Sequence, residues 1–218
     1  MDRFVVALDG PAGSGKSSIS EIIAKKLGFV RINTGAMYRA VAVEVKNRGL
    51  DPDNESSYDF LDDINIIYQN GNTMVNGKII SEEELKSVSN LASRCSKVKK
   101  VRDKMLKFQR DSAIGKVILD GRDIGTVVFP DADLKIFLDA KLEKRAERRY
   151  LEIKGTKIEQ SYEEIWNDMR KRDFEDRNRE IAPLKMAKDA ILVDTTDLSI
   201  DEVVSKINNL ILDRMRGK

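Results

Sequence analysis

The sequence has 218 residues, 41% hydrophobic and 35% charged, and its 39 basic and 37 acidic residues give no global case for nucleic-acid binding. It contains no histidine, which removes the most common general base and any Ser-His or Cys-His nucleophile pair. Its single cysteine, Cys95, excludes intrachain disulfides and cysteine-rich zinc sites. Chemistry performed by this chain therefore has to depend on charge and positioning.

The sequence also gives expectations about the surroundings of the protein. No apolar run approaches the roughly 18 residues that a membrane-spanning helix needs, so no membrane partner is expected. The first apolar segment begins within about three residues of the start, which leaves no room for a secretion signal. We expect a cytoplasmic protein that acts as a monomer.

A glycine-rich segment connects the first predicted strand to the first predicted helix. Phe4 to Leu8 is an unbroken apolar run of strand length, and apolar residues at helical spacing continue from Ile19 to Leu27. The segment between them fits the pattern G-x-x-x-x-G-K-[ST]; its residues are Gly10, Pro11, Ala12, Gly13, Ser14, Gly15, Lys16, Ser17 and Ser18. In this context the backbone N–H groups of the loop and the start of the helix wrap a phosphate group.

The spacing of this pattern assigns chemical roles to individual side chains. Lys16 is expected to reach the β and γ phosphates of a bound nucleoside triphosphate. Ser17 is expected to place its hydroxyl on Mg²⁺. Val117 to Asp120 is an apolar strand that ends in a carboxylate, and Asp120 is the second predicted magnesium ligand.

The order of the predicted elements indicates an α/β fold. Apolar runs of strand length alternate with helical patterns and are all expected to be buried; they are Phe4 to Leu8, Phe29 to Ile32, Val117 to Asp120, Leu134 to Leu138 and Ala190 to Val193. This alternation predicts a five-stranded parallel sheet with helices on both faces, in a single domain of residues 1–218.

Residues 63–97 interrupt the alternation and are interpreted as an insertion. Short apolar runs are separated by Asn-Gly pairs, the strongest short hairpin signal; the runs are Ile64 to Tyr68, Thr73 to Val75 and Lys78 to Ile80. Ser81 and Glu84 form a capping box, and the helix that they start is expected to continue to Cys95. The insertion is therefore predicted to be a small antiparallel sheet followed by a helix.

Two further helical regions follow the fourth core strand. The segment from Lys141 to Arg179 is highly charged, and Ser161 with Glu164 is expected to cap its second half. The last helix is predicted to start at Ser199 with Glu202. Most of the charge in the first region is expected to form a solvated, ion-paired helix surface.

Arginines follow the ends of predicted core strands. Arg39 comes after the second strand and Arg122 after the third, while Arg172 and Arg179 lie near the last strand. Guanidinium groups bind phosphate in a bidentate fork and stay charged, so several that converge would form a second anion pocket facing the first. A phosphate acceptor is already anionic and needs no base, which agrees with the absence of histidine.

Four segments together make this chain resemble the bacterial cytidylate kinases. They are Gly10 to Ser17, Thr34-Gly35-Ala36-Met37-Tyr38-Arg39, Asp120-Gly121-Arg122-Asp123 continuing to Ala132, and Asp176-Arg177-Asn178-Arg179. The similarity extends nearly from end to end. It implies an ATP-dependent phosphotransferase that acts on CMP or dCMP and gives CDP or dCDP and ADP.

The resemblance also implies roles for residues at matching positions. The monophosphate would be bound by Thr34, Arg39, Arg122 and Arg179, the base by Ser93, Arg102 and Asp123, and the ribose hydroxyls by Arg172 and Asp176. Residues 63–97 correspond to an insertion that binds the monophosphate. Residues 145–161 correspond to a helical lid over ATP, with Arg148 and Arg149 as its phosphate contacts; together with Lys16, Arg122 and Arg179 they complete the predicted catalytic set.

Three alternative interpretations stay open at this point. The acceptor could be another small molecule such as uridylate or shikimate. The chain could be a nucleotide-switched binding protein that hydrolyses ATP slowly. It could also bind nucleic acid through the short basic run Lys97, Lys99 and Lys100, although such runs are usually solvated helix surface.

Overall fold

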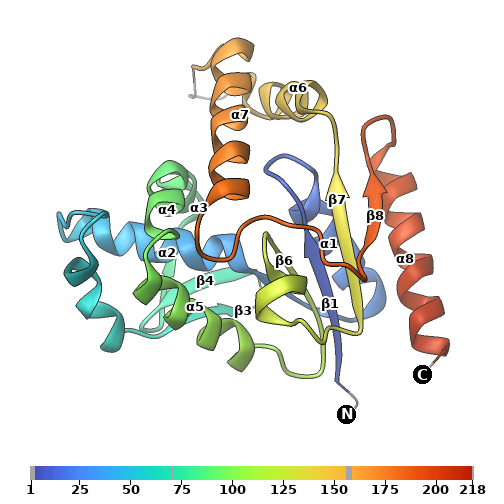
Figure 1. Cartoon of the computed structure of the whole chain (residues 1–218), viewed down its shortest axis with the longest axis horizontal. Coiled ribbons are helices and arrows are strands. Elements are labelled where there is room, and N and C mark those ends of the chain that lie inside the picture. Colours follow the sequence, from blue (N-terminus) through green and yellow to red (C-terminus); the bar gives the residue numbers. More distant parts are fainter. Residues whose placement is uncertain (1–2, 70, 156–158, 218) are drawn as a thin grey trace.

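The computed structural model describes residues 3–69, 71–155 and 159–217, and within them a parallel sheet forms the centre of the molecule (Figure 1). Its strands, in spatial order, are β2 (Val30–Asn33), β6 (Lys116–Gly121), β1 (Phe4–Asp9), β7 (Leu134–Asp139) and β8 (Ile191–Asp194). Every neighbouring pair is parallel, so all the strands end at one edge of the sheet. The predicted five-stranded parallel sheet is confirmed.

Alternating side chains of the central strand β1 enter two separate hydrophobic cores. Val5 and Ala7 face one core, which also contains residues of α2 (Thr34–Asn47) and α5 (Lys99–Asp111). Val6 and Leu8 face the other, which is covered by α1 (Lys16–Leu27) and α8 (Ile200–Arg216). Side chains that are apolar on both faces of a strand require cover on both sides, and Figure 1 shows helices on either side of the sheet.

The insertion contains the small antiparallel sheet that the Asn-Gly pairs predict. Its strands are β3 (Ile66–Gln69), β4 (Asn72–Val75) and β5 (Lys78–Ile80), paired in that order. A 3-10 helical segment, η1 (Glu55–Asp62), precedes it. Ile66 and Val75 belong to the same core as Val5 and α2, so the insertion packs on the central domain without a core of its own.

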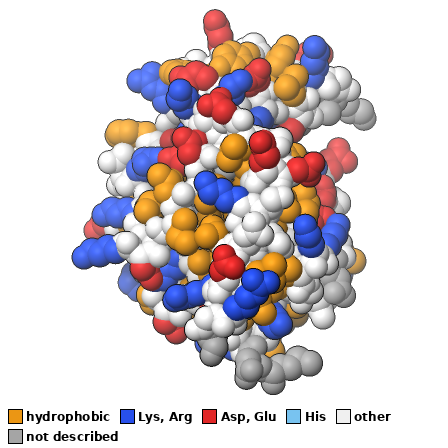
Figure 2. Space-filling view, turned by 90° about the vertical axis from the view of Figure 1, so that its right-hand side faces the viewer, with side chains coloured by type: hydrophobic (Ala, Val, Ile, Leu, Met, Phe, Trp, Pro, Cys, Tyr) orange, Lys and Arg blue, Asp and Glu red, His pale blue; other side chains and the backbone are white. Residues whose placement is uncertain are grey.

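Two expectations about regular structure are wrong. The helix expected from Ser81 to Cys95 is broken at Val88, whose backbone (φ −110°, ψ 17°) leaves the helical region and separates α3 (Glu82–Ser87) from α4 (Ser89–Cys95). The last core strand is also only partly buried, because β8 is the edge strand of the sheet: Val193 is fully buried, whereas Leu192 is 52% exposed. From the side of α8 and β8, hydrophobic side chains are visible at the surface among charged ones (Figure 2).

The charged region after β7 forms two helices that pack on each other beyond the ends of the strands (Figure 1). They are α6 (Leu142–Ile153) and α7 (Tyr162–Asn178), joined by a small core of Ala146, Ile153, Ile165 and Met169. The expected lid, residues 145–161, thus includes most of α6, and its residues 156–158 lie outside the described residues. Among the residues that the structure describes, no helix is long and apolar enough to cross a membrane.

The three capping boxes predicted from Ser-x-x-Glu are all present, and the one at Ser199 gives a test of the fold. The Ser199 hydroxyl accepts from the Glu202 N–H at 3.3 Å, and the Glu202 carboxylate accepts from the Ser199 N–H at 2.8 Å. Because this cap starts α8, Ser199→Ala is expected to lower the free energy of unfolding by about 1 kcal/mol in urea denaturation. Ser205→Ala, at an exposed position within α8, is the control; equal effects of the two substitutions would contradict the role of the cap.

Candidate active site

The glycine-rich loop predicted at residues 10–18 lies between β1 and α1, and two of its glycines are fixed by close contacts. A Cβ on Gly10 would lie 2.0 Å from the carbonyl oxygen of Leu138, the penultimate residue of β7. Gly13 has a left-handed backbone (φ +71°), and a Cβ there would lie 2.6 Å from the Met169 methyl group. The loop is therefore enclosed by β7 on one side and by α7 on the other.

Lys16 points back into this loop. Its ammonium donates to the Pro11 carbonyl at 2.5 Å and to the Ser14 hydroxyl at 3.1 Å, and the residue is only 6% exposed. Burial, followed by the positive charge of Arg122, lowers the pKa of Lys16 well below its usual value. A phosphate oxygen at the loop would supply the negative charge that this buried ammonium lacks.

The two predicted magnesium ligands lie side by side. The Ser17 hydroxyl donates to one oxygen of Asp120 at 2.9 Å, because β6 is the neighbour of β1 and Asp120 is paired with Leu8. These are hard oxygen donors of the kind that Mg²⁺ prefers. Among the described residues no group of three or more acidic, histidine or cysteine side chains could hold a metal ion. The pair therefore fits a Mg²⁺ whose remaining ligands are phosphate oxygens and water.

Three cationic side chains, Lys16, Arg39 and Arg172, have too few acidic partners among the residues that the structure describes. Burial and then the charge of Arg122 lower the pKa of Arg172 to about 10. Burial also lowers the pKa of Arg39. Attraction to Asp120 raises this pKa, and repulsion from Arg122 offsets part of that rise. The Nε atoms of both Arg39 and Arg172 are buried and have no hydrogen-bond partner among the described residues. Together with Lys16, these guanidinium groups form a cationic cluster of the kind that binds an anion.

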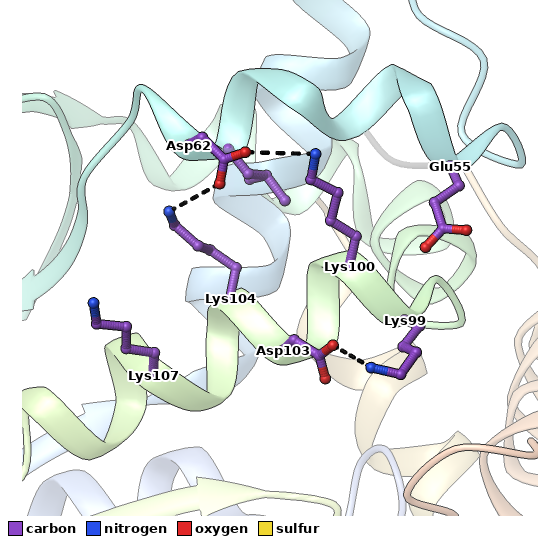
Figure 3. Close-up of a pocket in the computed structure, with 8 residues that line it drawn as sticks. Glu55, Asp62, Lys99, Lys100, Asp103, Lys104 and Lys107 are labelled. Atoms are coloured by element: carbon purple, nitrogen blue, oxygen red, sulfur yellow. Dashed lines mark hydrogen bonds and ion pairs between the residues drawn. The ribbon is translucent and has the colours of Figure 1, made fainter.

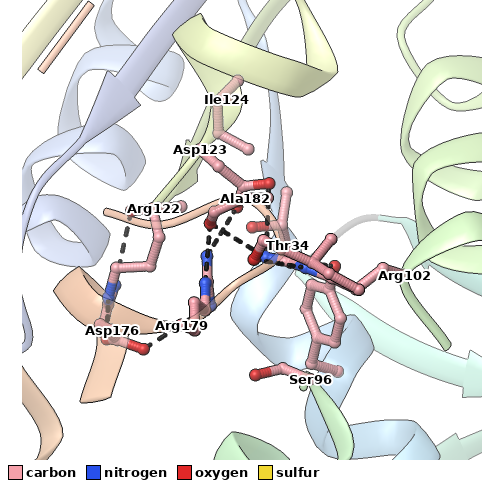
Figure 4. A network of polar contacts seen from close by, with 12 residues as sticks. Thr34, Ser96, Arg102, Arg122, Asp123, Ile124, Asp176, Arg179 and Ala182 are labelled. Atoms are coloured by element: carbon pink, nitrogen blue, oxygen red, sulfur yellow. Dashed lines mark hydrogen bonds and ion pairs between the residues drawn. The ribbon is translucent and has the colours of Figure 1, made fainter. Parts of the chain in front are cut away.

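A second group of charged side chains lies next to this cationic cluster, and its arginines and carboxylates are paired with one another (Figure 4). Arg122 donates to Asp176 at 2.8 Å, and Arg179 donates to Asp123 at 3.3 Å. Arg102 lies 3.5 Å from the other oxygen of Asp123. The structure therefore brings together four of the predicted phosphate-binding and base-reading residues with the predicted ribose-binding carboxylate, Asp176.

Tyr38 is a member of this group that the sequence analysis did not assign. Its hydroxyl accepts from Arg102 at 2.9 Å, and the guanidinium carbon of Arg102 lies 5.6 Å from the centre of its ring.

The Ala182 carbonyl also accepts from Arg179, at 2.7 Å, and Ala182 has a left-handed backbone (φ 49°). Non-glycine residues rarely adopt this conformation, and it is often found at functional sites.

The remaining two predicted substrate residues lie on α2 and α4. Thr34 is buried at the start of α2, and its hydroxyl donates to the Asp120 carbonyl at 2.8 Å. Ser93 lies on α4 and is half-buried, and its carbonyl accepts from the Ser96 hydroxyl at 2.8 Å. Thr34 thus borders the pair predicted to bind magnesium, and Ser93 comes from the insertion.

The two predicted lid contacts pair with residues outside the phosphate loop. Arg148 donates to the carbonyl and to the hydroxyl of Thr195, just after β8, and Arg149 pairs with Glu152 at 3.1 Å. Arg145, which was not assigned a contact, is buried and donates to the Ala12 carbonyl of the loop at 3.0 Å. The pattern R-x-x-R-R alone does not determine which of these arginines faces the loop.

The basic run that suggested nucleic acid lies over a separate groove between η1 and α5 (Figure 3). The groove has a volume of about 440 Å³ and contains both lysines and acids. Lys97 pairs with Glu175, Lys99 with Asp103 and Lys100 with Asp59. All three lysines thus have acidic partners, as expected for a solvated helix surface.

The sheet order, the helices on both faces and the loop after β1 define the class of P-loop nucleotide-binding proteins. A solved structure of an uncharacterized protein from Eubacterium ventriosum has a similar fold. The two superpose with a TM-score of 0.52 at 11% identity, over 96% of this chain and 98% of that one. At this identity the similarity supports the fold alone.

Sequence comparisons identify the family within this class. The sequence profile of cytidylate kinase matches residues 6–213. A cytidylate kinase from Caldicellulosiruptor saccharolyticus is 47% identical over 217 residues and covers 96% of both chains. One from Thermotoga neapolitana is 44% identical over 218 residues and covers 98% of this chain and 99% of its own. The chain belongs to the cytidylate kinase family, and the resemblance seen in the sequence is confirmed.

Asp9 holds the loop after β6 against the end of β1. Its carboxylate is 5% exposed and accepts from the N–H groups of Ile124 and Gly125 at 2.8 and 2.7 Å. Burial is the main reason that its pKa rises to about 6, and the nearby charge of Asp123 adds to the rise. The folded protein therefore retains the Asp9 proton to higher pH than the unfolded chain does.

This raised pKa predicts how stability changes with pH. The contribution of Asp9 is most favourable below about pH 4 and is lost as the pH rises through about 6. The stability of the wild type relative to Asp9→Asn is expected to fall by roughly 2 kcal/mol between about pH 4.5 and pH 7, measured by urea denaturation. Asp213→Asn, at a side chain that is 72% exposed, is the control. A constant difference between wild type and Asp9→Asn would disprove this role.

Proposed function

We propose that this protein is a nucleoside monophosphate kinase that transfers the γ-phosphoryl group of ATP to CMP or dCMP. The observation that carries the proposal is the cluster of incompletely paired cations, Lys16, Arg39 and Arg172, beside a phosphate loop and next to Arg122. A nucleotide switch needs one phosphate site, whereas a kinase with a phosphorylated acceptor needs two. The cytidylate kinase family supports CMP as the acceptor.

The donor side of the site is assigned to residues 10–18. Backbone N–H groups of this loop and the start of α1 would bind the β and γ phosphates of ATP, and Lys16 would pair with them. Ser17 and Asp120 would hold Mg²⁺, which neutralises the charge on the transferred group when it is bound. Arg145 links the loop to the lid helices through the Ala12 carbonyl and through Asp173, at 2.6 Å.

The acceptor side is assigned to the arginines at the ends of β2 and β6. Thr34, Arg39, Arg122 and Arg179 would bind the monophosphate and aim one of its oxygens at the γ phosphorus. That oxygen forms the new P–O bond as the bond to the β-phosphate oxygen breaks, which gives CDP or dCDP and ADP. Arg122, Arg179 and Lys16 would stabilise the charge that spreads over the transferred group, so positioning and electrostatics supply the catalysis.

Base and sugar recognition is assigned to Asp123, Arg102 and Asp176, which Figure 4 shows, together with Ser93 and Arg172. Asp123 would accept from the exocyclic amine of cytosine, while Arg102 and Ser93 would donate to its O2 and N3 acceptors. Uracil would leave these groups unpaired at a cost of roughly 1 to 3 kcal/mol each. Arg172 and Asp176 would bind the ribose hydroxyls, and since they can still hold the 3′-OH, dCMP should also be accepted.

The remaining assignments concern the two segments that flank the site. Residues 63–97 would complete the monophosphate pocket, and residues 145–161 would close over ATP and exclude water. Arg148 and Arg149 would contact phosphate only after leaving Thr195 and Glu152. Because every assigned residue comes from one chain of residues 1–218, we propose that the protein acts as a monomer.

Turnover with different acceptors tests the proposed function. ADP formation from ATP is expected to depend on an added monophosphate and to be faster with CMP or dCMP than with UMP or AMP, because only cytosine satisfies Asp123 and Arg102 together. Shikimate should not support turnover. ATP hydrolysis at the same rate without an acceptor would favour the nucleotide switch, and equal rates with CMP and UMP would remove the base assignment.

Asp123→Ala tests the base reader separately. It is expected to raise the KM for CMP at least about tenfold while ATP affinity stays unchanged, because the lost contact is to the acceptor base. Asp103→Ala is the matched control, since that carboxylate lies on α5 beside Arg102 but is 60% exposed and pairs with Lys99. Unchanged discrimination between CMP and UMP in Asp123→Ala would contradict the assignment.

A further inference from the structure

Arg31 contacts the predicted magnesium ligand from the edge of the sheet. It lies on β2, and its Nε donates to Oδ1 of Asp120 at 3.0 Å. Its side chain is only 13% exposed. The sequence analysis gave this residue no role, because it precedes the Thr34 segment and looks like one position of a short strand.

The two oxygens of Asp120 have different partners. Oδ2 accepts from the Ser17 hydroxyl at 2.9 Å, on the side of the phosphate loop. Oδ1 accepts from the Ser20 hydroxyl at 3.0 Å and from Arg31, on the side of β2. Arg31 and Ser20 thus fix the orientation of the carboxylate, and Arg31 also compensates its charge.

A second carboxylate keeps Arg31 in this place. Its Nη1 lies 3.4 Å from Glu21 on α1, which is half exposed, whereas Asp120 is 4% exposed. The buried contact with Asp120 is the closer of the two, and it lies where solvent screens charge least. The charge of Arg31 is therefore felt mainly at Asp120.

We propose that Arg31 is a positioning residue that prevents divalent cations from binding at Ser17 and Asp120 before the nucleotide arrives. A carboxylate already paired with a guanidinium attracts a free cation weakly, because the two charges nearly cancel at the metal-binding oxygen. The phosphates of a bound nucleotide bring several negative charges to the same place and outweigh Arg31. The metal therefore enters with the triphosphate, an order that rests on the proposed function.

Binding of Mn²⁺ to the nucleotide-free protein tests this inference, and electron paramagnetic resonance of free Mn²⁺ provides the measurement. Arg31→Gln keeps a hydrogen-bond donor but removes the charge, and is expected to bind Mn²⁺ about tenfold more tightly than the wild type. Arg31→Lys keeps the charge and is expected to bind like the wild type. Arg48→Gln, which removes an exposed arginine paired with Glu44 on α2, is the matched control and should also bind like the wild type.

A double variant locates any gain in affinity. Arg31→Gln with Asp120→Asn is expected to lose the tighter binding, because the gained cation lies on the Asp120 carboxylate. Circular dichroism and thermal unfolding establish that each variant is folded. Equal Mn²⁺ affinity in Arg31→Gln and wild type, or tighter binding that survives Asp120→Asn, would overturn the inference. Since no nucleotide is present, that result would leave the proposed kinase activity untouched.

Discussion

The arrangement of the site depends on two neighbouring parallel strands that end together. β1 and β6 are in register so that Leu8 lies opposite Asp120 and Asp9 opposite Gly121. The phosphate loop therefore begins beside the segment that carries Arg122 and Asp123. Asp9 fastens the two loops to each other by accepting two backbone N–H groups at the start of the π-helical segment η2 (Ile124–Val128). A buried carboxylate is costly, and here these two hydrogen bonds offset part of that cost.

Charge that is not balanced within the chain is the second constraint. Among the described residues, Arg39 and Arg172 each bury an Nε that has no hydrogen-bond partner, and the Lys16 ammonium donates to neutral oxygens of its own loop. Such groups lower the stability of the folded chain, since desolvation of a cation is not repaid. Asp123 and Asp176, by contrast, are paired with arginines. The incompletely paired cations are therefore preorganised for an anion. The two carboxylates assigned to the base and the ribose, by contrast, are already paired with arginines of the chain.

Much of the fold could be predicted because each signal was local. Apolar runs located the core strands, Asn-Gly pairs located the turns of the small sheet, and Ser-x-x-Glu located three helix starts. The exposure of Leu192 could not be predicted, because it results from the position of β8 at the edge of the sheet. The residues of one strand do not determine the order of strands in a sheet. The break at Val88 was missed because the apolar spacing continues through it. Within the site, the contact of Arg145 with the phosphate loop and the contact of Tyr38 with Arg102 depend on how each helix is rotated about its axis. The spacing of residues in the sequence does not determine that rotation.

One helix touches both halves of the site. Met169 and Asp173 of α7 meet the phosphate loop and Arg145, while Arg172 and Asp176, on the same helix, lie among the arginines of the other pocket. A helix is stiff over this length, so a tilt that accommodates one nucleotide moves the side chains that meet the other. If binding at one half tilts α7, thermodynamic reciprocity requires each ligand to alter the affinity for the other by the same factor. α7 thus offers a mechanical connection between the two halves of the site.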